Sequence, residues 1–207
     1  MERKVVEESK KIEVNAVDIA KQSLVDGIDY LLVLERTFDH DTRKLYELVG
    51  PLVRAVVADS QNETKFDELQ LIARAFIRAL FAHVEGITHV MRQVVLWACD
   101  RGEKDIDGSV QSELRNQRPR TKEGLVLAFE QFPKLFRSSF TLDKTNEGWN
   151  CFCQSIKIRD SITHPKAIMD FKMSGDAIRE AQLAAVWFNG VFHALLLSCS
   201  DESPKVI

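Results

Sequence analysis

Hydrophobic residues recur at steps of three and four positions along most of the chain, which is the spacing of one face of an α-helix. The longest such run predicts one helix over residues 64–98, with Gly86 as a point where it could kink. Its apolar positions are Phe66, Leu69, Ala73, Phe76, Leu80, Val84, Ile87, Met91, Val94 and Ala98. The apolar–polar alternation that would predict strands does not stand out, so the pattern predicts an all-α protein.

Five further helices are predicted from the same spacing and from residues that favour helix ends. They cover residues 5–36, 41–58, 121–137, 146–165 and 174–198. The second of them is expected to bend or break at Gly50–Pro51, and the third is interrupted late by Pro133. Ser174 is expected to cap the last helix.

The polar stretch of residues 101–120 predicts a long loop with room for one short turn of helix. A loop of this length in a compact domain is more often functional or mobile than idle. The short connections elsewhere favour antiparallel neighbours. We therefore expect a single domain over residues 1–207, built as an antiparallel bundle of about five to six helices.

Composition agrees with long helices, because only 9 Gly and 5 Pro in 207 residues provide few turns. The formal net charge of −3 argues against a protein that coats polyanions in general, but it leaves room for a local basic patch. The sequence offers no cluster with the spacing of metal ligands, and neither a metal nor a cofactor is expected.

The N-terminal sequence MERKVVEESKK lacks the apolar core of a signal peptide. The 4 cysteines form no CxxC pair, so we expect reduced thiols in a cytoplasmic protein. The most apolar window, residues 181–199, is borderline in length for a membrane span and carries Gln182, Asn189 and His193. A buried core helix is expected there, without a membrane.

Two Arg-x4-His pairs occur in the chain, and helix geometry separates them. Residues five apart on a continuous helix point about 140° away from each other. Arg78 and His83 fall in mid-helix, so they are not expected to converge, and His83 is expected to be a hydrogen-bonded core or interface histidine. Arg159 and His164 differ because Pro165 disfavours the α conformation at His164, so the imidazole can swing back toward the arginine. A helix-ending histidine beside a solvated arginine explains the spacing equally well.

The stretch GWNCFCQSIKIRDSITHPK, residues 148–166, resembles the signature region of HEPN-domain proteins. These are all-α bundles whose hallmark is an arginine, a polar residue, further residues and then a histidine. Arg159, Asp160 and His164 occupy these places, and the family often continues with proline, as Pro165 does here. The resemblance covers about twenty residues by motif and most of the chain by architecture.

The resemblance implies a metal-independent endoribonuclease, in many relatives a toxin or defence effector, that acts as a homodimer with two motifs facing across the interface. His164 would take the proton from a ribose 2′-OH or supply one to the leaving oxygen, since histidine as a residue type titrates near neutral pH. Arg159 would hold the scissile phosphate, and Asp160 would orient either residue. Attack by the 2′-OH would leave a 2′,3′-cyclic phosphate and restrict the substrate to RNA.

Lys166 departs from the pattern of some HEPN toxins, which carry there a tyrosine that a partner nucleotidyltransferase modifies. Control by that route is therefore not expected, and Lys166 is either a phosphate contact or a solvated charge. Arg115, Arg118 and Arg120 form the best local basic cluster, which could steer RNA phosphates or merely solubilise the loop.

A stripe of mixed charge follows one side of the longest predicted helix. It contains Arg78, Glu85, His89 and Arg92, and such a stripe is usually a solvated, ion-paired face. The alternative is that Glu85 or Arg92 reaches into the groove of Arg159 and His164 and helps to bind substrate.

The first hypothesis is thus a HEPN-type endoribonuclease with Arg159, Asp160 and His164 as its catalytic residues. The second is a HEPN-like bundle without catalysis that binds RNA, a nucleotide or a protein. A third is a toxin whose activity an antitoxin or another regulatory protein masks.

Overall fold

The computed structural model describes the backbone of residues 2–102, 104–117 and 119–201, and within these ranges the side chains of residues 27–200. In this part of the chain it contains helices and no β-strand, which confirms the all-α prediction. The α-helices are α1 (Glu2–Ala58), α2 (Glu63–Asp100), α3 (Gly108–Arg115), α4 (Thr121–Leu135), α5 (Glu147–Thr163) and α6 (Gly175–Asp201). A short 3-10 helix, η1 (Ile168–Phe171), connects α5 with α6.

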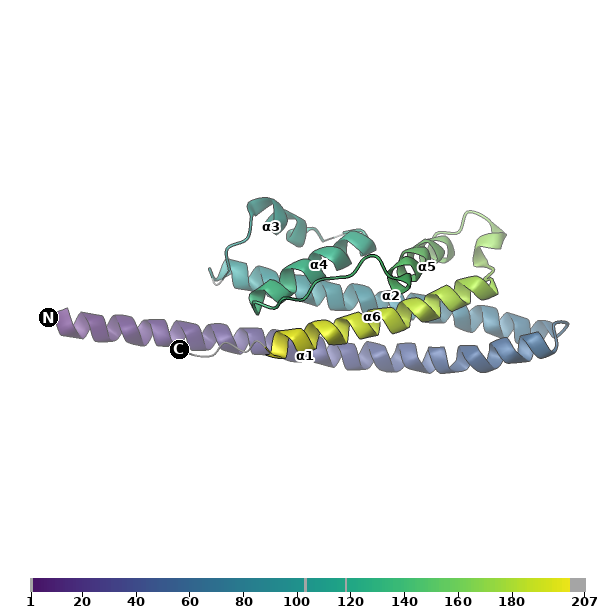
Figure 1. Cartoon of the computed structure of the whole chain (residues 1–207), viewed down its shortest axis with the longest axis horizontal. Helices are drawn as coiled ribbons and strands as arrows, with labels where there is room; N and C mark the ends of the chain where they lie inside the picture. The colour runs from purple at the N-terminus through teal and green to yellow at the C-terminus, as the bar shows by residue number, and fades with distance from the viewer. Residues whose placement is uncertain (1, 103, 118, 202–207) are drawn as a thin grey trace.

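Helix α2 is the centre of the bundle, because it contacts each of the other α-helices. Helices α1 and α2 form a long antiparallel hairpin, while α3, α4 and α5 lie along the opposite side of α2 (Figure 1). Helix α6 runs beside α1 and packs most extensively against α5. The N-terminal part of α1 extends beyond the rest of the bundle (Figure 1).

Aromatic side chains fill the core where these helices meet. The largest fully buried side chains are Phe76, Phe81, Phe129, Phe132, Phe152, Phe188, Phe192, Leu31, Ile77, Leu80, Ile87 and Met91. Most of the apolar stripe predicted on residues 64–98 is buried, and α2 spans that whole range. Gly86 permits close packing there, because a Cβ at this position would lie 2.9 Å from the ring of Phe38 on α1.

Helix α1 corrects the prediction of two separate helices, since it is continuous through residues 37–40 and through Pro51. Phe38 packs on α2, with its ring 5.7 Å from that of His83. On either side of Pro51, Val49 and Leu52 are buried in the core. Packing of this face against α2 therefore outweighs the local cost of the proline, which sequence pattern alone does not reveal.

Residues 101–120 are not one loop, because α3 occupies Gly108–Arg115. The short turn of helix allowed by the sequence is thus present. Asp107 caps α3 by accepting a hydrogen bond from the backbone N–H of Ser109 at 2.8 Å. Arg92 of α2 holds the C-terminal end of α3, since its guanidinium donates hydrogen bonds to the backbone carbonyls of Leu114 and Asn116.

Helix α6 is long and apolar enough, by length and composition, to cross a membrane. In this structure one of its faces is buried in the bundle, through Ala181, Phe188, Phe192 and Leu195. Ser174 caps it as predicted, accepting a hydrogen bond from the N–H of Ala177 at 3.1 Å.

His83 is a core histidine, as expected, but the expected hydrogen bond is missing. Only 1% of the residue is exposed, and neither ring nitrogen has a hydrogen-bond partner among the described residues. Its ring is stacked on Phe38 and meets Phe188 edge-on, with ring centres 5.3 Å apart. Burial lowers the pKa of His83 from 6.5 to about 4, with the nearby Asp39 opposing and His193 adding to this shift.

Candidate functional site

Helix α5 carries the Arg-Asp-x3-His sequence, and its ends are fixed by local interactions. Asn146 caps the start by accepting a hydrogen bond from the N–H of Trp149 at 2.8 Å. The helix ends at Thr163, where Pro165 excludes a further turn. His164 leaves the helical conformation (φ −125°, ψ 62°), and its N–H donates to the carbonyl of Asp160 at 2.9 Å. The predicted helix end at His164 is therefore confirmed.

The first turns of α5 are held against α6 and α2 by a cluster of aromatic rings. Phe152 is fully buried, with ring centres 5.1 Å from Trp187 and 5.7 Å from Phe81. Gly148 lets α5 and α6 approach, because a Cβ at this position would lie 2.6 Å from the Cβ of Trp187. The position of the site thus depends on close packing at the start of α5.

Gly148→Ala is expected to lower the free energy of unfolding by about 1–3 kcal/mol, because Trp187 must shift to admit the methyl group. Gly190→Ala on α6 is the matched control, since nothing lies within 4 Å of a Cβ added there. That control is expected to raise stability by up to about 1 kcal/mol through helix propensity. Chemical denaturation of the two variants compares them, and equal midpoints would contradict the role given to Gly148.

Arg159 is half-buried and is held by side chains from three helices. Its guanidinium lies 3.1 Å from Glu85 of α2 and 3.2 Å from Asp160, the next residue on α5. It also donates a hydrogen bond to the hydroxyl of Thr121 at the start of α4. The guanidinium carbon Cζ of Arg159 lies over the ring of Phe81, 5.2 Å from the ring centre. Arg159 is therefore fixed in one place, with both of its carboxylate partners at the surface.

His164 is exposed and lines an open groove between the end of α5 and η1. The groove has a volume of about 770 Å³ and is lined by Lys157, Asp160, Ser161, His164, Lys166, Ala167 and Asp170. Asp170 closes one side, accepting hydrogen bonds from the N–H groups of Lys166 at 2.7 Å and Ala167 at 2.9 Å. These hydrogen bonds lower the pKa of Asp170 and keep its carboxylate ionised.

Arg159 lines a neighbouring groove of about 510 Å³ between α5, α2 and the start of α4. The residues of this groove include Glu85, Arg120, Thr121, Lys122, Glu123, Cys153, Lys157, Arg159 and Asp160. Lys157 and Asp160 belong to both grooves. The structure thus brings Arg159 and His164 to adjoining hollows on one face, rather than to a single contact.

The predicted substrate-binding residues divide into those at the grooves and those elsewhere. Glu85 and Arg120 line the Arg159 groove, and Lys166 lines the His164 groove. Arg92 does not reach either groove, because it is only 3% exposed and bonds to backbone carbonyls in the last turn of α3. Arg115 forms an ion pair with Asp100, away from both grooves.

Arg118, which was predicted to bind substrate, lies outside the described residues. Glu85, from the stripe of mixed charge on α2, reaches the groove of Arg159 and forms an ion pair with that arginine.

Three residues that the sequence analysis did not place at the site help to build it. Arg78 donates to the carbonyl of Ile162 at 3.0 Å and so holds the last turn of α5 to α2. Thr121 bridges Glu85 and Arg159, donating to the carboxylate of Glu85 at 2.7 Å. Lys157 lies three positions before Asp160 on the same face of α5, a spacing that would have identified it.

Other reactive groups near the grooves are not activated. Burial raises the pKa of the Cys153 thiol, which keeps it protonated near neutral pH. No group of three or more His, Cys, Asp or Glu side chains in the described part of the chain is placed to hold a metal ion. None of the four cysteines forms a disulfide.

Comparison of the chain with models of known families, with curated proteins and with solved structures finds no match.

Proposed function

We propose that this protein is a HEPN-type, metal-independent endoribonuclease that cleaves RNA by attack of a ribose 2′-OH and leaves a 2′,3′-cyclic phosphate. The observation that carries the proposal is the arrangement at the end of α5. The exposed His164 lines one groove together with Lys157 and Lys166, and Arg159 lines the adjoining groove. A ribonuclease of this kind needs a group that moves a proton and a fixed positive charge at the phosphate, and both are present on this one face.

His164 suits proton transfer because its side chain is accessible and its backbone is fixed. The helix-end hydrogen bond to Asp160 and the bond from Arg78 to the last turn hold its position. Lys157 and Lys166, which line the same groove, supply positive charge for the phosphates on either side of the scissile bond. His164 would act as general base or acid, and the lysines as substrate contacts.

Arg159 would stabilise the charge that develops on the scissile phosphate. Its guanidinium is already oriented by Thr121 and by stacking on Phe81, so little ordering remains to be done on binding. A phosphate would have to share or replace the carboxylates of Glu85 and Asp160. Both carboxylates are about half exposed, at 48% and 59%, which makes such an exchange feasible in solvent.

The experiment that tests the proposal is cleavage of a defined panel of RNAs in EDTA, with analysis of the product ends. Ends carrying 2′,3′-cyclic phosphate, and no cleavage of the same sequences as DNA, are the expected results. Products with 3′-OH ends, or activity that EDTA abolishes, would reject this mechanism.

A second candidate function is a non-catalytic bundle that binds RNA, and a specific observation favours it. Arg159 is engaged by two carboxylates and by Thr121, which is the arrangement of a structural arginine as much as of a catalytic one. Binding of the same RNAs without cleavage under any condition would support this candidate over the first.

Glu85→Gln is expected to tighten the binding of RNA about three- to fivefold, because it removes a negative charge that competes with phosphate for Arg159. Glu130→Gln is the matched control, since Glu130 is about equally exposed and forms a comparable ion pair with Lys144, outside both grooves. The measurement is the Kd of an RNA with 2′-deoxy residues, which cannot be cleaved, at one fixed salt concentration. Equal affinities of the two variants would show that Glu85 does not compete with phosphate.

The proposal extends to assembly and control, following the resemblance alone. The protein would be a cytoplasmic homodimer with two α5 ends facing across the interface, and an antitoxin or other regulatory protein would mask its activity. Growth arrest on expression that Arg159→Ala relieves would support a toxin role, and harmless expression of the active protein would count against it.

A further inference from the structure

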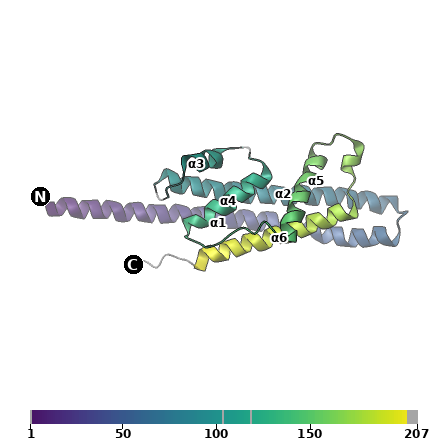
Figure 2. The ribbon, with the colours of Figure 1, turned by 45° about the horizontal axis from the view of Figure 1, so that its top comes forward.

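An exposed apolar segment stands next to the His164 groove and is not explained by the catalytic residues. In η1, Ile168 is 83% exposed, Met169 65% and Phe171 40%. The connection that carries η1 projects from the bundle between the ends of α5 and α6 (Figure 2). Apolar side chains gathered at one exposed place are a candidate binding surface.

The backbone of this segment is fixed, although its side chains are exposed. Arg74 of α2 donates to the carbonyl of Phe171 at 2.9 Å. Gln70, also on α2, binds both the N–H of Met173 at 2.6 Å and its carbonyl at 3.0 Å. On the other side, the carboxylate of Asp170 ties down the N–H groups of Lys166 and Ala167. The apolar side chains are thus presented from a rigid turn, which lowers the entropy lost on binding.

Three lysines lie on and beside the segment. The amino groups of Lys157, Lys166 and Lys172 form no ion pair with a carboxylate among the described residues. Asp160 is paired with Arg159, whereas Asp170 keeps its negative charge while it accepts hydrogen bonds from backbone N–H groups. The three lysines outnumber this one remaining carboxylate, so the charge around the apolar segment is positive on balance, which is complementary to phosphate.

We propose that residues 166–172 bind an unpaired nucleotide of the RNA, with its base stacked on Phe171 and its phosphates held by Lys166 and Lys172. The inference rests on the proposed function and deepens it, because it makes single-stranded RNA the substrate class. An aromatic ring between lysines is the usual arrangement for binding single strands, since every base has a face that can stack. A base inside a duplex is stacked on its neighbours and offers no face to Phe171.

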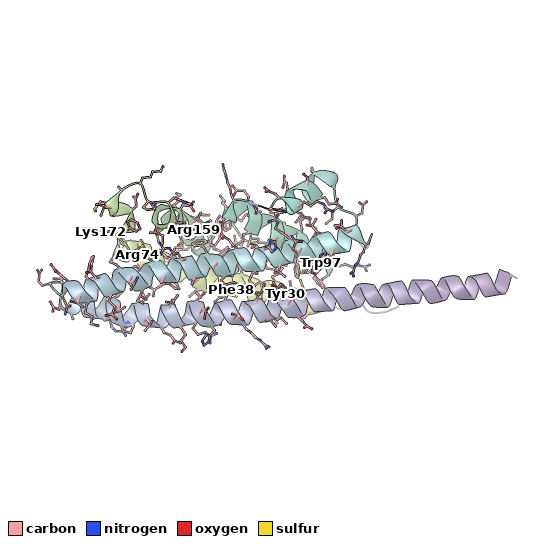
Figure 3. The ribbon with its side chains drawn as sticks, turned by 180° about the vertical axis from the view of Figure 1, so that it is seen from behind. Tyr30, Phe38, Arg74, Trp97, Arg159 and Lys172 are labelled. Atoms are coloured by element: carbon pink, nitrogen blue, oxygen red, sulfur yellow. The ribbon has the colours of Figure 1, made fainter. Side chains whose placement is uncertain are left out.

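The test is the affinity for RNA of Phe171→Ala, measured in the His164→Ala background so that the probe stays intact. The probes are a twelve-nucleotide single-stranded RNA of mixed sequence and a duplex of the same sequence. Phe171→Trp keeps a stacking ring, and Tyr30→Ala removes an aromatic side chain that is 55% exposed elsewhere. Tyr30 lies far along the bundle from Lys172 and Arg74 (Figure 3).

Phe171→Ala is expected to bind the single strand about 5- to 150-fold more weakly, with duplex affinity changed less than about twofold. Phe171→Trp and Tyr30→Ala are expected to bind as the parent does. Equal affinity of Phe171→Ala and the parent for the single strand would overturn the inference, as would an equal loss for both probes.

The failure of the inference differs from the failure of the proposed function. Cleavage by the native protein together with unchanged binding by Phe171→Ala overturns the stacking site alone. Weakened single-strand binding without any cleavage by the native protein supports the stacking site and rejects catalysis. A parent that binds neither probe overturns the stacking site, while the cleavage assay with the native protein decides the proposed function. A change in oligomeric state on Phe171→Ala with RNA affinity unchanged identifies the segment as a protein-docking surface and overturns the inference.

Discussion

His164→Ala is expected to lower the rate of RNA cleavage by about 10²–10⁴-fold, the contribution of a positioned acid or base. The side chain lies at the surface, so its removal leaves no cavity and exposes no buried partner. Circular dichroism and the midpoint of thermal unfolding should therefore match those of the native protein. The measurement is the single-turnover rate on a defined RNA in EDTA.

The control for this variant is His40→Ala, which removes an exposed histidine from α1, outside both grooves. It should cleave RNA at the native rate. Added imidazole should restore part of the activity of His164→Ala if the lost group transfers a proton. Native activity in His164→Ala would show that the end of α5 is not the catalytic site.

Acidification from pH 7 to pH 4 is expected to destabilise the fold by about 3 kcal/mol through His83 alone. Burial holds the pKa of His83 at about 4 in the folded protein, against 6.5 for a free histidine. Between pH 4 and pH 6.5 the side chain of His83 is protonated in the unfolded chain and neutral in the folded protein. The contribution of His83 is therefore complete above pH 6.5, is lost as the pH falls toward 4, and does not change further below that value.

The variant that isolates this effect is His83→Leu, which replaces two unsatisfied ring nitrogens with apolar atoms. Its stability at pH 7 should be close to or above that of the native protein, because no hydrogen bond is lost. Its unfolding free energy, measured by urea denaturation across pH 4–7, should depend on pH less steeply by about one proton. His40→Leu, which removes an exposed histidine, is the control. An identical pH profile of His83→Leu and the native protein would contradict the account.

The helices of this protein were predictable where local signals fix them. Residues close together in the chain determine the apolar stripe of α2. They also determine the ends of α5, through Asn146 at its start and Pro165 just after its last residue. Helix α1 was not predictable in this way, because the packing of Phe38 and Val49 against the bundle carries it through Pro51. Such packing brings together residues that are far apart in the chain, and the spacing of apolar residues along the sequence does not reveal these contacts.

The candidate site divides along the same line. The place of His164 at the end of α5 follows from Pro165 and was predicted. That Glu85 reaches the groove of Arg159 was one of two alternatives, whereas the ion pair between these residues and the hydrogen bond of Arg159 to Thr121 were not foreseen. Arg92 was a candidate for substrate binding because of its charge. It is buried instead, and it donates hydrogen bonds to backbone carbonyls at the C-terminal end of α3.

The contacts of Arg159 also bear on when the site can form during synthesis. Its hydroxyl partner Thr121 lies 38 residues earlier in the chain, and the carboxylate of Glu85 a further 36 residues before that. Helix α5 is in turn supported by Trp187 of α6, near the end of the sequence. A nascent chain would therefore have no assembled groove until α6 has left the ribosome, so a product of interrupted translation would lack the site altogether.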